Sequence, residues 1–96
     1  MHETYANKLL VMYVIRRDEQ ETRIGISVSK KVGNSVVRHR VTRLIRESFR
    51  LNRAEIETGL DIVVVARPAA RDSDYKMIES AFVHLCGLHN IKKELK

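Results

Sequence analysis

A row of basic side chains on one face of a predicted helix is the feature of this sequence best suited to chemistry. Residues 34–52 have helical spacing, and one arc of that helix collects His39, Arg43, Arg46 and Arg50. A guanidinium group can bind a phosphate through two hydrogen bonds and can stack on a base. The arc therefore predicts binding to a nucleic-acid backbone.

Further residues extend this predicted surface around the start of the helix. They are Lys30, Lys31, Arg38 and Arg40. Asn34 or Ser35 is a suitable N-cap. The first amide groups of a helix attract phosphate because they lack partners within the helix. One end and one side of the helix therefore both favour an RNA or DNA backbone.

The distribution of charge supports the same partner. The formal net charge is +6, and residues 23–53 hold nine Lys or Arg against one acid, Glu47. Residues 54–96 are nearly balanced, with six bases and seven acids. A solvated helix face usually mixes charges of both signs, and a membrane-surface helix usually presents bulky apolar side chains on its free face. Neither description fits, so we expect nucleic acid and no membrane as partner.

The elements that must position this helix have clear patterns. Residues 8–16 are apolar on both faces and predict a strand covered on both, and residues 23–29 alternate and predict its hairpin partner. Residues 61–66 are β-branched and predict a central buried strand, and Ser73 is expected to cap a last helix. The class is α+β in the order β-β-α-β-α, with residues 1–96 forming a single domain.

Composition excludes several other classes of protein. The chain has one cysteine, Cys86, so an internal disulfide cannot form. No apolar run approaches the roughly 18 residues that a membrane span needs, and the N-terminus lacks the basic and then apolar pattern of a signal peptide. We expect a cytoplasmic protein.

Two other groups of residues have chemistry that we do not expect to be used. His84, Cys86 and His89 lie close in sequence, but structural zinc normally takes four ligands, and on a helix His84 faces away from Cys86. His39 has no carboxylate pair or second histidine nearby in sequence that would make it a general base. We expect no metal held by the protein and no catalytic side chain.

The helix and its flanks resemble the bacterial ribonuclease P protein component. Residues 30–50 read KKVGNSVVRHRVTRLIRESFR. They are similar to the family signature, which has a Lys-Lys-x-Gly-Asn-Ala-Val opening, an Arg-Asn-Arg centre and a Lys-Arg-Leu-Ile-Arg end. The preceding Arg-x-Gly-x-Ser-Val-Ser-Lys pattern also matches, as do Tyr-Ala-Asn near the start and the later Asp-Ile-Val-Val-Val-Ala-Arg-Pro segment. The likeness covers roughly residues 5–90.

The resemblance implies both a function and a fold. In this family an RNA subunit is the catalyst, magnesium is expected with that RNA, and the protein helps to remove the 5′ leader of precursor tRNA. The arginine-rich helix binds the catalytic RNA. By position, the residues that fall in its RNA-facing motif are Lys30, Lys31, Asn34, Arg38, His39, Arg40, Arg43 and Arg46. A cleft between this helix and the sheet holds the leader, with Val11 and Tyr13 on its floor, where Tyr13 either stacks on a base or is a core aromatic. The implied fold is a small two-layer sandwich similar to the second domain of ribosomal protein S5, with a left-handed β-α-β crossover where right-handed ones are the rule.

The sequence departs from the family pattern in three places. His39 stands where the family usually has Asn, and Thr42 stands where it usually has Lys, but the arginines are kept. The sequence also begins shortly before Tyr5, whereas the family carries a further basic segment with a first helix. We therefore expect one face of the first strand to lack its usual cover, with self-association or exchange of an element between chains as the result.

Two other functional classes stay open. One is a general RNA-binding module of a ribosome-associated or transcriptional complex, and the other is a stand-alone nuclease. A helix-turn-helix reader needs a second helix three or four residues from the basic one, whereas we expect a strand after Gly59. A stand-alone nuclease lacks the catalytic residues described above. Cleavage of precursor tRNA by the catalytic RNA alone, by this protein alone and by both together separates the three.

Overall fold

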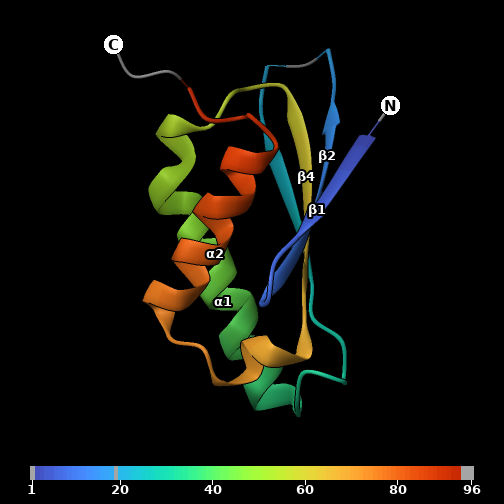
Figure 1. Ribbon diagram of the computed structural model, residues 1–96, viewed down its shortest axis with the longest axis vertical. Helices are drawn as coiled ribbons and strands as arrows, with labels where there is room; N and C mark the ends of the chain where they lie inside the picture. The colour runs from blue at the N-terminus through green and yellow to red at the C-terminus, as the bar shows by residue number, and fades with distance from the viewer. Residues whose placement is uncertain (1, 19, 94–96) are drawn as a thin grey trace.

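A computed structural model describes residues 2–18 and 20–93 of the chain. Strands form one sheet, and both α-helices lie on the same side of it (Figure 1). The elements are, in chain order, β1 (His2–Ala6), β2 (Leu10–Arg16), β3 (Arg23–Ser27), α1 (Ser35–Asn52), the 3-10 helix η1 (Arg53–Glu55), β4 (Leu60–Ala66), the 3-10 helix η2 (Pro68–Asp72) and α2 (Tyr75–Leu88).

The sheet has the strand order β1-β2-β4-β3. β4 is antiparallel to β2 on one side and parallel to β3 on the other, so its predicted central position is confirmed. The predicted hairpin of residues 8–16 with 23–29 is wrong, because the apolar β4 takes the place between these two strands. A parallel pair needs a crossover connection, and α1 supplies it between β3 and β4.

A further strand, β1, precedes those that the sequence predicts, so the order is β-β-β-α-β-α. It pairs antiparallel with β2 at the edge of the sheet. Asn7 makes the tight turn between them, since its amide donates to the carbonyl of Leu10 at 2.9 Å and its side-chain oxygen accepts from the amides of Leu9 and Leu10 at 3.2 and 3.0 Å. β1 is short and largely polar, and its apolar pattern was too weak to predict it.

The core lies between the sheet and the two helices. Alternate residues of the central strands point into it, among them Leu10, Met12, Ile62 and Val64, each at most 1% exposed. The helices contribute Val41, Ile45, Phe49, Ile78, Phe82 and Leu85. The side of α1 opposite the basic arc therefore faces the core. No helix in the described ranges is long and apolar enough to cross a membrane.

Side chains cap the start of both helices. The side-chain oxygen of Asn34 accepts from the amide of Val37 at 3.0 Å, as one of the two predicted caps of α1 would. At α2 the cap is Asp74, which accepts from the amide of Met77 at 2.9 Å. The predicted cap, Ser73, is wrong by one residue, because it ends η2 and is buried there.

Candidate nucleic-acid interface

The outer face of α1 presents the predicted basic arc to solvent. His39, Arg43 and Arg46 are exposed, and within the described part of the chain their side chains make no hydrogen bond or ion pair. On the opposite side of the helix, Val41 and Ile45 are fully buried. The core therefore fixes the direction in which the arginines point, and their guanidinium groups stay free to bind phosphate.

Arg50 is also exposed, but its guanidinium group contacts the Glu47 carboxylate one turn earlier on the same helix. The hydrogen bond from Arg50 lowers the pKa of Glu47, and the same bond raises the pKa of Arg50. Water screens an ion pair at this position, so the pair contributes little to stability and a phosphate can replace the carboxylate. The strongest unpaired charge on α1 therefore lies at Arg43 and Arg46.

Two arginines of the predicted motif are turned partly into the fold. Arg40 donates from Nη1 to the carbonyl of Ser73 at 2.7 Å and from Nη2 to the carbonyl of Arg71. Arg38 is half-buried, and its Nε is buried without a partner among the described residues. Arg40 therefore joins α1 to η2, a role that the helical wheel could not show.

The turn before α1 places two lysines beside the start of the helix. The carbonyl of Ser29 accepts from the amide of Val32 at 3.0 Å, and the hydroxyl of Ser29 accepts from the amide of Lys31 at 3.3 Å. Val32 is 1% exposed and anchors the turn in the core, whereas Lys30 and Lys31 are exposed. Asn34 acts as the cap, so its contribution to the interface is to shape the helix start.

Gly33 gives this turn its close approach to α1. A Cβ atom at residue 33 would lie 2.8 Å from Cγ1 and 2.9 Å from Cβ of Val37. Both distances are shorter than a van der Waals contact, so the added methyl group would clash with the Val37 side chain. Gly33→Ala should therefore lower the free energy of unfolding by about 1–3 kcal/mol, as overpacking usually does. Urea unfolding monitored by circular dichroism measures the loss.

The matched control for this change is Gly87→Ala, which also adds one methyl group. A Cβ atom at residue 87 would meet nothing within 4 Å, and the residue lies in α2. This change should leave stability equal or raise it by up to about 1 kcal/mol, because alanine favours the helix. Equal losses for the two variants would show that the contact with Val37 is not the cause.

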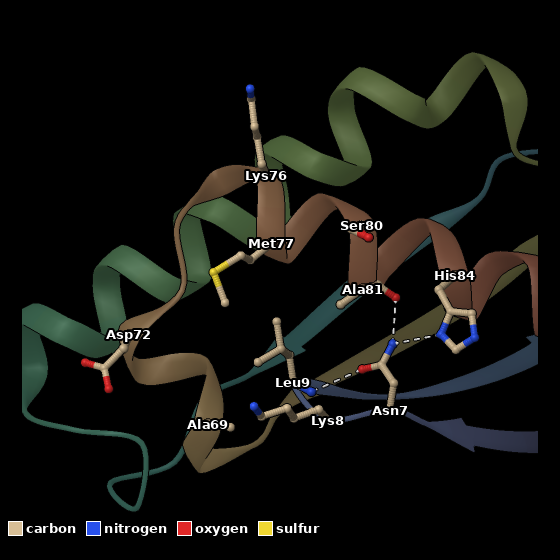
Figure 2. Close-up of a pocket in the computed structure, with 10 residues that line it drawn as sticks. All are labelled: Asn7, Lys8, Leu9, Ala69, Asp72, Lys76, Met77, Ser80, Ala81 and His84. Carbon is tan, nitrogen blue, oxygen red and sulfur yellow. Dashed lines mark hydrogen bonds between the residues drawn. The ribbon is translucent and has the colours of Figure 1, made fainter.

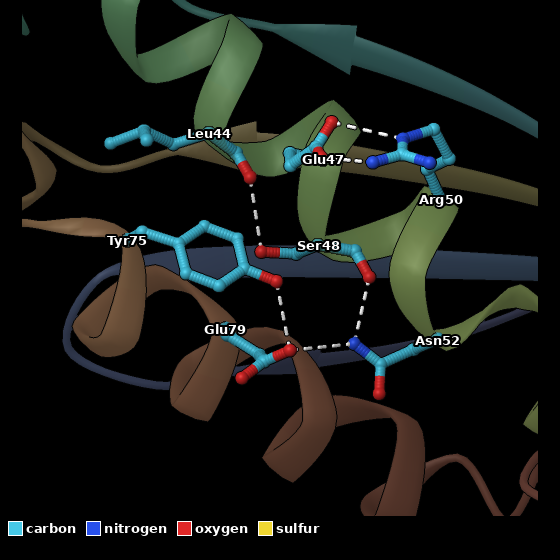
Figure 3. A network of polar contacts seen from close by, with 7 residues as sticks. All are labelled: Leu44, Glu47, Ser48, Arg50, Asn52, Tyr75 and Glu79. Atoms are coloured by element: carbon cyan, nitrogen blue, oxygen red, sulfur yellow. Dashed lines mark hydrogen bonds and ion pairs between the residues drawn. The ribbon is translucent and has the colours of Figure 1, made fainter.

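A polar network between the helices holds the second half of α1 in place (Figure 3). The Tyr75 hydroxyl donates to Oε2 of Glu79 at 2.8 Å, and Nδ2 of Asn52 donates to the same oxygen at 3.1 Å. Asn52 also donates to the carbonyl of Ser48 at 2.8 Å. Burial, followed by the contact with the Glu79 carboxylate, raises the pKa of Tyr75. The network joins residues distant in sequence, so no local pattern predicted it.

The face of the sheet opposite the helices carries Val11 and Tyr13. Both are half-buried, and in the register of the sheet they lie beside Val65 and Val63. The expectation that both faces of this strand are covered is wrong for the part of the chain described. α1 lies on the other face, so it does not wall the expected cleft above Val11 and Tyr13.

Charged residues border one end of this open face. The Asp61 carboxylate binds Nη1 of Arg17 at 2.7 Å and Nε of Arg23 at 3.1 Å. In the sheet Asp61 lies between Ile15 and Arg23 on neighbouring strands. No local sequence pattern indicates this cluster, because its members come together only when β4 lies between β2 and β3.

The three residues with metal-binding chemistry have other contacts. The exposed His84 meets Nδ2 of Asn7 at 3.2 Å, and the buried His89 bonds to the carbonyl of Met12 through Nε2 at 2.9 Å. Burial raises the pKa of the Cys86 thiol to about 12, so the thiol stays protonated. Across residues 2–18 and 20–93, no three histidine, cysteine or carboxylate side chains gather as metal ligands would.

This arrangement defines a small α+β nucleic-acid-binding protein whose basic helix is backed by a mixed sheet. The profile of the family Ribonuclease P matches residues 1–89. The chain is 57% identical over 89 residues to the ribonuclease P protein component of Lachnoclostridium phytofermentans, which covers 93% of this chain and 77% of that protein. It is 58% identical over 80 residues to that of Alkaliphilus metalliredigens, covering 83% and 72% of the two chains.

Solved structures agree with the sequence comparison. The RNase P protein of Staphylococcus aureus superimposes with a TM-score of 0.85 at 34% identity, covering 94% of this chain and 83% of that one. The RNase P protein of Thermotoga maritima superimposes with a TM-score of 0.82 at 27% identity, covering 88% of this chain and 81% of that one. The chain belongs to the bacterial ribonuclease P protein family. It is the protein subunit of this ribonucleoprotein endoribonuclease and acts in the 5′ maturation of tRNA, so its partners are the ribonuclease P RNA and precursor tRNA.

Proposed function

We propose that the chain binds the catalytic RNA through the outer face of α1, together with Lys30 and Lys31, and takes the 5′ leader on the open face of the sheet. The observation that supports this most strongly is the pair Arg43 and Arg46, exposed and unpaired among the described residues on a helix anchored in the core. Magnesium accompanies the RNA subunit, and no protein side chain takes part in bond cleavage. The proposed location is the cytoplasm, which suits a chain with a single cysteine.

Cleavage of precursor tRNA at low magnesium tests this proposal. The reaction is run with the catalytic RNA alone, with the protein alone and with both. We expect no cleavage by the protein alone and faster cleavage by the two together than by the RNA alone. A general RNA-binding module, the second candidate, would bind RNA without this gain. A helix-turn-helix reader does not fit the structure, because α1 is followed by η1 and then by β4.

Binding to the catalytic RNA should depend strongly on salt. If α1 and the preceding turn neutralise four to six phosphates, log K should fall against log salt with a slope of roughly −3 to −5, because each neutralised phosphate releases counterions. Filter binding over a series of potassium chloride concentrations measures the slope. A slope near zero would rule out the electrostatic contacts proposed here.

Tyr13→Leu should weaken binding to precursor tRNA and spare binding to mature tRNA, both measured with the assembled ribonucleoprotein. A base stacked on an aromatic ring contributes about 1–3 kcal/mol, and leucine keeps the apolar bulk while losing the ring. Tyr13→Phe is the matched control and should retain leader affinity. If Tyr13→Leu binds both RNAs as the unchanged protein does, Tyr13 has no part in leader binding.

Self-association through the open face stays a prediction. Ile15 and Val63 of this face are 41% and 38% exposed, and an apolar patch of this kind favours contact with a partner. Light scattering over a range of protein concentrations measures it. If the same face takes the leader, addition of precursor tRNA should dissociate the self-associated form.

A further inference from the structure

A groove lies apart from both surfaces described above, between the β1–β2 turn, η2 and the first turns of α2 (Figure 2). Its volume is about 830 Å³. Leu9, Met77 and Ala81 give it an apolar floor, and Met77 is 47% exposed. Lys8 stands on the side of the β1–β2 turn and Lys76 on the side of α2. The groove thus combines apolar area with a lysine on each side, and Lys76 directs its ammonium group away from the floor.

Hydrogen bonds fix the walls of this groove before any ligand arrives. Nδ2 of Asn7 donates to the carbonyl of Ala81 at 3.0 Å and meets Nδ1 of His84 at 3.2 Å. Because the Asn7 amide nitrogen can only donate, Nδ1 of His84 accepts this hydrogen bond. Arg67 donates from Nη1 to the carbonyl of Asn7 at 2.9 Å, which ties β4's end to the same turn.

The groove is connected to the basic face of α1 through η2. A second hollow, of about 410 Å³, runs beside His39, Arg40 and Arg43 on α1. Arg40 bonds to the carbonyl of Arg71, and the next residue, Asp72, lines the groove. A nucleic-acid strand bound along α1 would therefore meet the exposed Arg71 of η2 before it reaches the groove.

We propose that this groove holds one unpaired nucleotide of the catalytic RNA, an inference that rests on the RNA binding proposed for α1. The apolar floor packs against one face of the base, and the Asp72 carboxylate accepts hydrogen bonds from N–H groups at the base edge. Lys8 and Lys76 lie where the flanking phosphates would pass. A peptide strand fits less well, because the amides of Leu9 and Leu10 in the turn are already bonded to Asn7.

The first test compares two exposed apolar residues on one face of α2. Leu88 lies three turns beyond Met77, about 16 Å along the helix, and is 43% exposed but outside the groove. Met77→Glu should weaken binding to the catalytic RNA by about fivefold to 100-fold, the range expected when a methionine side chain is no longer buried against the ligand. Leu88→Glu makes the same change of charge and should stay within about twofold. Equal losses, or no loss for Met77→Glu, would overturn the proposal, provided that thermal melts show both variants folded.

A second test locates the contact on the RNA. Met77→Cys and Arg46→Cys are each labelled with a thiol-reactive aryl azide and photolysed with the catalytic RNA or with precursor tRNA alone. The native Cys86 is 2% exposed and should not react. We expect Met77→Cys to crosslink to one unpaired nucleotide of the catalytic RNA.

The outcomes of the crosslinking separate this inference from the proposed function. Crosslinks from Arg46→Cys without any from Met77→Cys would leave α1 binding intact and exclude the groove. If Met77→Cys crosslinks to precursor tRNA and not to the catalytic RNA, the proposal that the groove holds a nucleotide of the catalytic RNA is wrong. Failure of both variants to crosslink would contradict RNA binding by α1 itself.

Discussion

Replacing Arg43 and Arg46 together by alanine is expected to weaken binding to the catalytic RNA by about 100-fold and to leave the melting temperature unchanged. A hydrogen bond to a charged group contributes about 1.5–3 kcal/mol, so two lost phosphate contacts cost roughly 3 kcal/mol or more, and each 1.4 kcal/mol is a tenfold change in affinity. Both side chains are exposed and lack partners within the described residues, so their removal disturbs no packing.

Filter binding beside circular dichroism melts measures both parts of this expectation. Lys92→Ala/Lys93→Ala is the control of equal charge, since both lysines are exposed and follow α2, away from the outer face of α1. The control should lose only a small factor in RNA affinity, because its net charge is lower. If the arginine variant melts early, or if the two variants bind alike, the orientation assigned to α1 is wrong.

Ile45→Ala should have the opposite profile, with a large loss of stability and little change in RNA affinity of the folded fraction. Ile45 is adjacent to Arg46 but is 0% exposed and belongs to the hydrophobic core between the helices and the sheet. Truncation of a buried isoleucine to alanine costs about 2–5 kcal/mol through lost transfer free energy and the remaining cavity. Urea unfolding gives the change in the free energy of unfolding, and RNA titration below the transition gives the affinity.

Leu51→Ala provides the control for this second change. Leu51 is apolar and on the same helix, but it is 55% exposed, so its truncation should alter the free energy of unfolding by no more than about 0.5 kcal/mol. A comparable loss at both positions would mean that burial does not decide the cost. If the Ile45→Ala protein is stable but has lost RNA affinity, the assignment of the buried and the RNA-binding faces of α1 is the wrong way round.

The sequence was sufficient to predict α1, because every part of it has a local pattern. Asn34 supplies a cap, the apolar residues recur at helical spacing, and the unpaired charge falls on the opposite arc. The central position of β4 was predictable for the same reason, since a run of β-branched residues suits a strand with neighbours on both sides. These parts of the fold are specified by residues close together in the chain.

The remaining features depend on contacts between distant segments. The partner of β2 was predicted wrongly because chain order favours a hairpin with β3, and only the pairing energies of the whole sheet select β4. The contacts of Arg40 with the carbonyls of Arg71 and Ser73 could not be predicted, because those residues lie about 30 positions further along the chain. Likewise, no spacing rule connects Asn52 with Glu79 across the two helices.

The position of β4 in the sheet has a consequence for folding of the chain during its synthesis on the ribosome. Synthesis releases β1, β2, β3 and α1 before β4, yet β3 pairs with no strand except β4 among the described elements. The apolar side of α1 likewise has an incomplete surface to dock on until residue 66 has emerged. The arginine face therefore gains its fixed geometry late and in one cooperative step. RNA that binds only the native state stabilises that state by mass action. The catalytic RNA should therefore also favour folding of the newly synthesised chain.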